Sequence, residues 1–248
     1  MKLNKTTILA LLSLVILGIS TLKSDDGVSV HVGADVMSRY IFRGTDYGNS
    51  PSIQPTFSIS TGGFEIGYWG AISLTSYYQE IDLYAKYTIG GLSIIFTDYY
   101  IPYITSDPAS SDIRYFVFDD KKTAHTFEGA LAYDFGEGFP LKIYASTFFY
   151  GNDKRWGYDE EKDKDEKTYF STYLELGYPL ISGNNNLDLF VGMTPSAGAF
   201  GNTMGVINLG FTGSKKVKMT NDFELPVKSS VIYNPQLSLV YFVFGITL

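Results

Sequence analysis

The sequence contains no cysteine, and its 248 residues include only two histidines and two tryptophans. Without cysteine the chain has no disulfide, no thiol nucleophile, no thiolate metal site and no lipid anchor on an N-terminal cysteine. Basic residues are also few: 19 lysines and arginines stand against 26 acidic residues, for a net charge of −7. An acidic chain without a basic stripe is a poor nucleic-acid binder, so we expect no nucleic-acid partner.

Long apolar runs are missing beyond the N-terminus. The longest, residues 239–246, is far shorter than the ~20 residues that a membrane-spanning helix needs. At the N-terminus, Lys2 and Lys5 precede an apolar segment and small residues, as in a secretory signal peptide. We expect residues 1–20 to be a signal peptide, cleaved between about 20 and 24, and residues 25–248 to form one domain. An uncleaved membrane anchor is the alternative.

Aromatic residues are abundant, at 16% of the chain, and consist mainly of 20 tyrosines and 18 phenylalanines. Together with 25 glycines, this composition suits short strands, tight turns and an aromatic girdle at a membrane interface. The apolar content, 45%, excludes a disordered chain.

Alternation of apolar and polar residues is the main structural signal. It is clearest in residues 80–89, where every second side chain is apolar (Ile81, Leu83, Ala85, Tyr87 and Ile89). Successive side chains of a strand point to opposite faces, and a transmembrane barrel has apolar-out, polar-in segments of ~10 residues. A soluble amphipathic helix would show a period of 3.6 instead.

The same pattern predicts about twelve strands. They cover residues 28–43, 53–60, 64–73, 80–89, 92–100, 124–134, 141–150, 168–180, 187–193, 205–212, 223–232 and 237–248. Lipid cannot satisfy an open sheet edge, so spanning strands must close into a barrel. We therefore predict an all-β fold, a transmembrane antiparallel up-and-down β-barrel in the cell outer membrane.

The lengths of the connections support this topology. Every second connection is short, as at residues 61–63 and 90–91, whereas the two longest, 101–123 and 151–167, fall on the opposite side. Short periplasmic turns and long external loops are typical of outer-membrane barrels. Residues 213–221 are the exception, because they are long for a turn.

The last segment, residues 237–248, alternates up to the final residue, Leu248. Outer-membrane barrels commonly end on such a strand, which the barrel-assembly machinery recognises, although the last residue is usually aromatic. We expect outer-membrane lipid and this machinery to be partners of the chain.

Several segments resemble the TorF-type porins of Gram-negative outer membranes: DVMSRYIFRG (35–44), GGFEIGYWGA (62–71), EIDLYAKYTIGGLSIIFTDYYIP (80–102) and FEGALAYDFG (127–136). The ending VFGITL is similar to the termini of Bacteroidetes-type outer-membrane proteins. The resemblance covers the first half of the chain well and the second half loosely. It implies a porin-like outer-membrane protein but no particular substrate, and residues 45–47 depart from the family's usual loop.

Polar and bulky side chains predicted to face inward are the candidate pore-lining residues: Asp35, Arg39, Arg43, Glu65, Trp69, Asp82, Lys86, Glu128, Lys142, Glu175 and Asp188. Opposed charges across a lumen create a transverse field that selects small polar solutes. The alternative is that these charges pair with one another and plug the barrel. The arginines either bond carboxylates of other strands or line a water-filled path and favour anions.

Catalytic signals are weak. Enzymes with a serine or aspartate nucleophile need a histidine beside it. His31 is expected to face inward near the periplasmic end, and His125 to lie near the outer rim on the lipid-facing side, each without a catalytic role. The acidic residues 153–167 lack the spacing of a calcium loop. We expect no enzyme activity, cofactor or metal.

The function predicted from the sequence is a porin-like channel for passive diffusion of small polar solutes across the outer membrane. The alternative is a non-conducting structural or adhesive barrel with a plugged lumen.

Overall fold

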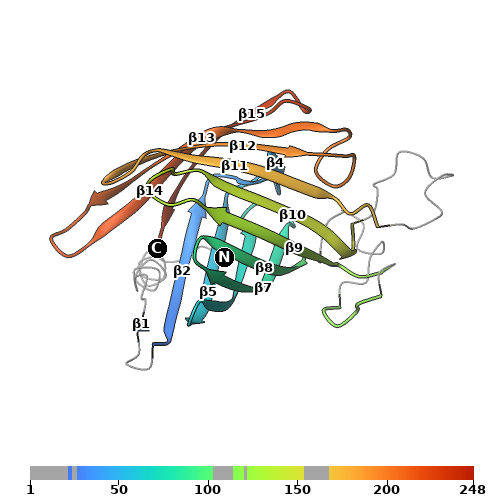
Figure 1. Cartoon of the computed structure of the whole chain (residues 1–248), viewed down its shortest axis with the longest axis horizontal. Coiled ribbons are helices and arrows are strands. Elements are labelled where there is room, and N and C mark those ends of the chain that lie inside the picture. The colour runs from blue at the N-terminus through green and yellow to red at the C-terminus, as the bar shows by residue number, and fades with distance from the viewer. Residues whose placement is uncertain (1–21, 24–26, 103–113, 120–121, 154–167) are drawn as a thin grey trace, which may run out of the picture.

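The computed structural model describes residues 22–23, 27–102, 114–119, 122–153 and 168–248 (Figure 1). Its regular structure is entirely β, and twelve antiparallel strands form a closed up-and-down barrel. These are β2 (Ser29–Met37), β5 (Ser52–Thr61), β6 (Phe64–Ser73), β7 (Gln79–Ile89), β8 (Leu92–Tyr100), β9 (His125–Asp134), β10 (Lys142–Gly151), β11 (Thr172–Ile181), β12 (Asn185–Thr194), β13 (Gly205–Lys218), β14 (Glu224–Asn234) and β15 (Leu239–Thr247). The predicted fold class is confirmed. Residues 1–20 lie outside the described residues.

Each wall strand pairs with the next along the chain, and β2 pairs with both β5 and β15 to close the ring. A two-residue strand, β1 (Leu22–Lys23), adds to the start of β2. Two further short strands, β3 (Tyr40–Phe42) and β4 (Thr45–Tyr47), form a separate two-stranded sheet.

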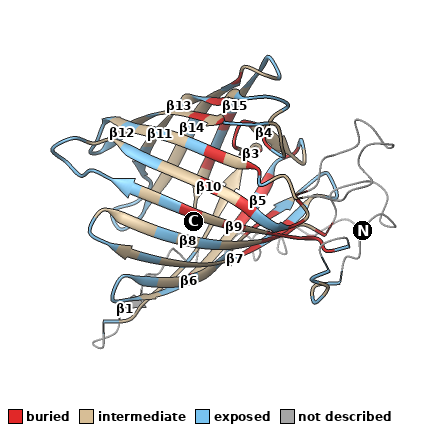
Figure 2. Cartoon of the chain, turned by 45° about the vertical axis from the view of Figure 1, so that its right-hand side comes forward, coloured by how far each residue is buried: buried red, intermediate tan, exposed pale blue. Residues whose placement is uncertain are grey.

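The predicted alternation is present along the wall, as the striped exposure of the strands in Figure 2 shows. On β7, Ile81 and Leu83 are exposed, whereas Glu80 and Asp82, which alternate with them, are buried. Exposed apolar side chains of this kind surround the barrel (Ile66, Leu83, Phe96, Leu131, Leu176, Leu209 and Phe242). The barrel is therefore apolar outside and polar inside, the reverse of a protein that folds in water.

The two rims differ in the length of their connections. One, the turn rim, carries residues 62–63, 90–91, 135–141, 182–184 and 219–223. The other, the loop rim, carries residues 38–51, 74–78, 101–124, 152–171, 195–204 and 235–238. The expected long turn at 213–221 was wrong: β13 continues to Lys218, with Lys216 opposite Pro226 of β14, and only residues 219–223 turn. This end of β13 is rich in lysine, so the apolar–polar pattern did not reveal that the strand extends beyond the apolar part of the outer wall.

The predicted first strand, 28–43, was also wrong at its end. β2 stops at Met37, and β3 and β4 form a hairpin of their own, residues 38–51, which we call the lumen hairpin. Its turn is made by Arg43 and Gly44, with φ of 50° and 80°, as a two-residue hairpin turn requires. Alternation continues through Tyr40 and Phe42 because β3 is itself a strand, but these rings do not face outward.

The seam between β15 and β2 has a short ladder, Gly245–Thr247 against Asp35–Met37. Backbone bonds between Ala34 and Leu248 extend it at one end. Across it, Lys228 Nζ of β14 lies 2.5 Å from Asp35 of β2, and the Thr247 hydroxyl donates to the same carboxylate at 2.6 Å. These contacts join three strands where backbone pairing is least.

Candidate functional site

The lumen hairpin crosses the interior of the barrel. At its tip, Arg43 bonds Glu128 of β9, and the Gly44 carbonyl accepts a 3.0 Å bond from the Asn234 amide of β14. Near its base, the Tyr40 ring lies 5.0 Å from Trp69 of β6. Because β6, β9 and β14 belong to different parts of the wall, the hairpin divides the lumen.

Arg43 and Glu128 form a buried ion pair. Nη2 of Arg43 donates to Oε1 at 2.9 Å, while Nη1 lies 2.6 Å from Oε2 as a close charge contact outside hydrogen-bond geometry. The hydroxyls of Tyr99 and Tyr144 also donate to Oε1, at 3.0 and 2.9 Å. The side chains of the pair are 6% and 1% exposed, so each charge depends on the other for its neutralisation.

Aromatic rings enclose the guanidinium of Arg43. Its central carbon lies 4.5 Å from the ring centre of Phe42, 4.6 Å from that of Phe200 and 4.8 Å from that of Tyr173. Such contacts stabilise a cation, most strongly where water is excluded. The same rings join the buried cluster of Tyr99, Phe148, Tyr173, Phe200 and Ile207, so this side of the lumen is dry.

Gly44 permits the tip to reach the wall. A Cβ at this position would lie 1.9 Å from the carbonyl oxygen of Ile207, and the φ of 80° also disfavours any other residue. Docking of the hairpin on β13 therefore depends on a glycine here.

Two acidic side chains of β7, Glu80 and Asp82, lie near the base of the hairpin. Tyr78 donates to Glu80 at 2.6 Å, and both Glu80 and Asp82 are buried. Burial and the nearby Glu80 raise the pKa of Tyr78 above its ordinary range and that of Tyr47 to about 12, so both hydroxyls stay un-ionised.

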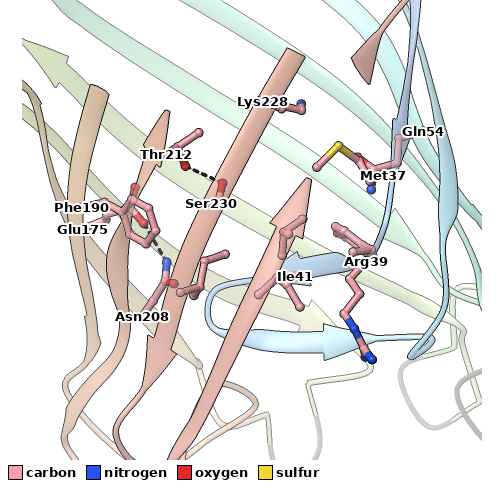
Figure 3. Close-up of a pocket in the computed structure, with 13 residues that line it drawn as sticks. Met37, Arg39, Ile41, Gln54, Glu175, Phe190, Asn208, Thr212, Lys228 and Ser230 are labelled. Atoms are coloured by element: carbon pink, nitrogen blue, oxygen red, sulfur yellow. Dashed lines mark hydrogen bonds between the residues drawn. The ribbon is translucent and has the colours of Figure 1, made fainter. Parts of the chain in front are cut away.

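The other side of the hairpin is open and polar. Arg39 and Ile41 face a cavity of about 390 Å³, whose far wall includes Asn208, Thr212 and Ser230 of β13 and β14 (Figure 3). Arg39 is held by Asp46 and Asn49 of the hairpin itself. Unlike Arg43, it is 40% exposed and remains in contact with water.

A second cavity, of about 540 Å³, lies toward the turn rim. Its lining includes the predicted residues Lys142 and Asp188, and it shares Glu175 and Phe190 with the first cavity. The two cavities are therefore adjacent, and together they extend from the turn rim to the hairpin.

The remaining predicted residues form separate pairs on the inward face. Glu65 lies 2.9 Å from Lys86 and accepts a bond from Tyr84 at 2.8 Å. Lys142 is 3.7 Å from Asp134, and Glu175 accepts a bond from Asn208 at 3.2 Å. The predicted residues therefore do not form one cluster: they divide among the Arg43–Glu128 pair, the base of the hairpin, the Glu65–Lys86 pair, the two cavities and the seam.

Sequence reasoning missed the aromatic partners of Arg43, above all Phe200, which lies in a loop and outside any alternating strand. It also missed Asp46, which pairs with Arg39 within the hairpin. Among the described residues, no group of three or more His, Cys, Asp or Glu side chains could hold a metal ion. The predicted acidic loop at 153–167 falls almost wholly outside the described part.

No family model matches the chain, and no curated protein matches its sequence. In the described part of the chain, no helix is long and apolar enough to cross a membrane.

Proposed function

We propose that this protein is an outer-membrane channel that passes small polar solutes along a narrow path beside the lumen hairpin. The observation that carries the proposal is the pair of adjacent cavities, which share Glu175 and Phe190 and leave one side of the hairpin open. The path is lined by polar groups such as Asn208, Thr212 and Ser230. Twelve strands fall between barrels filled by side chains and barrels with a wide aqueous channel, so large solutes are excluded.

Location in the outer membrane is supported by the closed barrel, its exposed apolar outer face and the sorting of short and long connections between the rims. The predicted signal peptide, the alternating C-terminal strand and the resemblance to TorF-type porins favour the same location. Outer-membrane lipid and the barrel-assembly machinery remain the partners that we propose.

Single-channel recording of the purified protein in planar bilayers tests the proposal. We expect a small, steady conductance for the wild type and a larger one for Gly44→Ala, because a Cβ at this position displaces the hairpin tip from Ile207. Gly136→Ala is the matched control. Its φ is also 80°, but nothing lies within 4 Å of its Cβ position, so its conductance should equal that of the wild type.

The second candidate function is a non-conducting structural or adhesive barrel. It is favoured by the buried Arg43–Glu128 pair and by the aromatic cluster that seals one side of the hairpin. A silent wild type with a conducting Gly44→Ala variant would select this candidate. If neither protein conducts, the channel proposal is wrong.

A further inference from the structure

The outer wall of the barrel carries a pair of ionisable side chains near the loop rim. Asp98 of β8 lies beside Phe127 in the ladder, and Tyr100 lies beside His125 of β9. Asp98 and His125 both lie on the outward-facing side of their strands, the side on which Phe96 is exposed. Under the proposed function this side faces the bilayer, where ionisable groups are costly and are retained for a function.

His125 is nevertheless fully buried, with no exposed surface. The segment of residues 114–119, between β8 and β9, covers it. Ring centres surround the imidazole at 4.8 Å (Tyr100), 4.9 Å (Tyr115), 4.7 Å (Phe118) and 6.0 Å (Phe127). The Tyr150 hydroxyl of β10 donates to the Phe118 carbonyl at 2.5 Å, which adds a second attachment.

Both ring nitrogens of His125 face acceptors. Nδ1 lies 2.7 Å from Oδ1 of Asp98, and Nε2 lies 2.6 Å from the backbone carbonyl oxygen of Tyr115. A carbonyl only accepts, so Nε2 must carry a hydrogen. The Nδ1 contact then needs a second proton, either on the ring or on the carboxyl group. A neutral His125 and an ionised Asp98 together carry one proton too few for both hydrogen bonds. The two bonds can therefore form together only while the pair holds one additional proton.

Among the described residues, the titratable groups in contact with the ring are Asp98 and Tyr100 from β8 and Tyr115 from the covering segment. Burial, with smaller contributions from Asp98 and Tyr100, raises the pKa of Tyr115, so this phenol stays neutral across the range in which histidine and aspartate titrate. The extra proton therefore belongs to the Asp98–His125 pair.

We propose that the Asp98–His125 pair is a proton-held latch that fixes the segment of residues 114–119 to the outer wall of the barrel. At low pH the pair holds its proton and both bonds form. As the pH rises the proton leaves, the ring keeps one N–H for two acceptors, and either Tyr115 or Asp98 loses its bond. An unpaired buried acceptor is unfavourable, so the segment leaves the wall. The latch concerns the outer surface and is independent of conduction through the lumen.

Hydrogen exchange read by mass spectrometry tests the latch on the full protein in lipid nanodiscs. Amides of residues 114–119 should be protected at low pH and lose protection as the pH rises, after correction for the intrinsic pH dependence of exchange. His31→Gln, at the other histidine, is the control and should leave this profile unchanged.

Two variants separate the latch from simple packing. In Asp98→Asn, the amide can donate to Nδ1, so a neutral His125 makes both bonds and protection should persist at every pH. In His125→Phe, the phenyl ring fills the space between the surrounding aromatic rings but has no N–H to donate, so protection should be absent at every pH. A wild-type profile that does not change with pH, or an Asp98→Asn profile identical to that of the wild type, would overturn the proposal.

Discussion

The two arginines of the lumen hairpin show how burial decides what a charge does. Arg43 and Arg39 are four residues apart, and each contacts a carboxylate. Arg43 is enclosed by rings and bonded to Glu128, so it fastens the hairpin to the wall. Arg39 contacts Asp46 at the edge of the cavity and stays in water. Of the two roles expected from the sequence, closing the lumen fits Arg43, and lining a path fits Arg39.

Arg43→Ala should destabilise the protein strongly, because it leaves Glu128 buried without its cation. The expected loss in the free energy of unfolding is about 3–5 kcal/mol, measured by urea unfolding followed by tryptophan fluorescence. Arg39→Ala removes a partly exposed pair and should cost at most about 1 kcal/mol. The double variant Arg43→Met/Glu128→Gln should recover much of the loss. Equal effects of the two single variants would contradict a buried, mutually dependent pair.

Among the elements, the wall strands could be predicted from the sequence and the lumen hairpin could not. Alternation is local, and one face of each strand must be apolar, so the parity of residues such as Glu65, Asp82 and Glu128 follows from their neighbours. Where a strand packs in the fold, by contrast, depends on residues that are distant in the sequence. Tyr40 and Phe42 alternate as wall residues do, but their contacts are with Trp69 and Phe200, which are distant in the sequence.

The same limit applies to His125. Its outward parity near the loop rim was predicted and is observed, but its partners were not. Asp98 interrupts an apolar face, which is a signal that sequence reasoning could have used. The covering segment gives no such signal, because nothing in residues 114–119 indicates where they fold.

The seam between β15 and β2 is the element most dependent on side chains. Asp35→Asn should lower the temperature at which the barrel unfolds in a heat-shift gel assay, because it weakens the Lys228 contact where the ladder is short. Glu65→Gln is the matched control: Glu65 is equally exposed and also contacts a lysine, but it lies between strands with long ladders. A larger shift for Glu65→Gln would show that the seam does not limit stability.

At the scale of the whole molecule, the polarity of the barrel and the division of its interior determine what it can do. The outer face offers apolar side chains on every side, which is typical of a barrel wall that contacts lipid. Inside, the lumen hairpin leaves one dry side and one polar side. A channel needs both properties: a wall that lipid tolerates and an interior that keeps water.

The orientation of the wall toward lipid is tested by placing one charge on either face at the same depth. Phe96 lies at the middle of β8 and is exposed on the outer face, while its neighbour Thr97 faces inward beside Tyr84. A lysine near the bilayer midplane costs roughly 2–4 kcal/mol, so Phe96→Lys should reduce the free energy of folding into lipid vesicles by about this amount. Thr97→Lys keeps its charge in the polar interior and should cost much less. In a barrel surrounded by water the order would reverse, because Phe96→Lys would place its charge in solvent and Thr97→Lys would bury one.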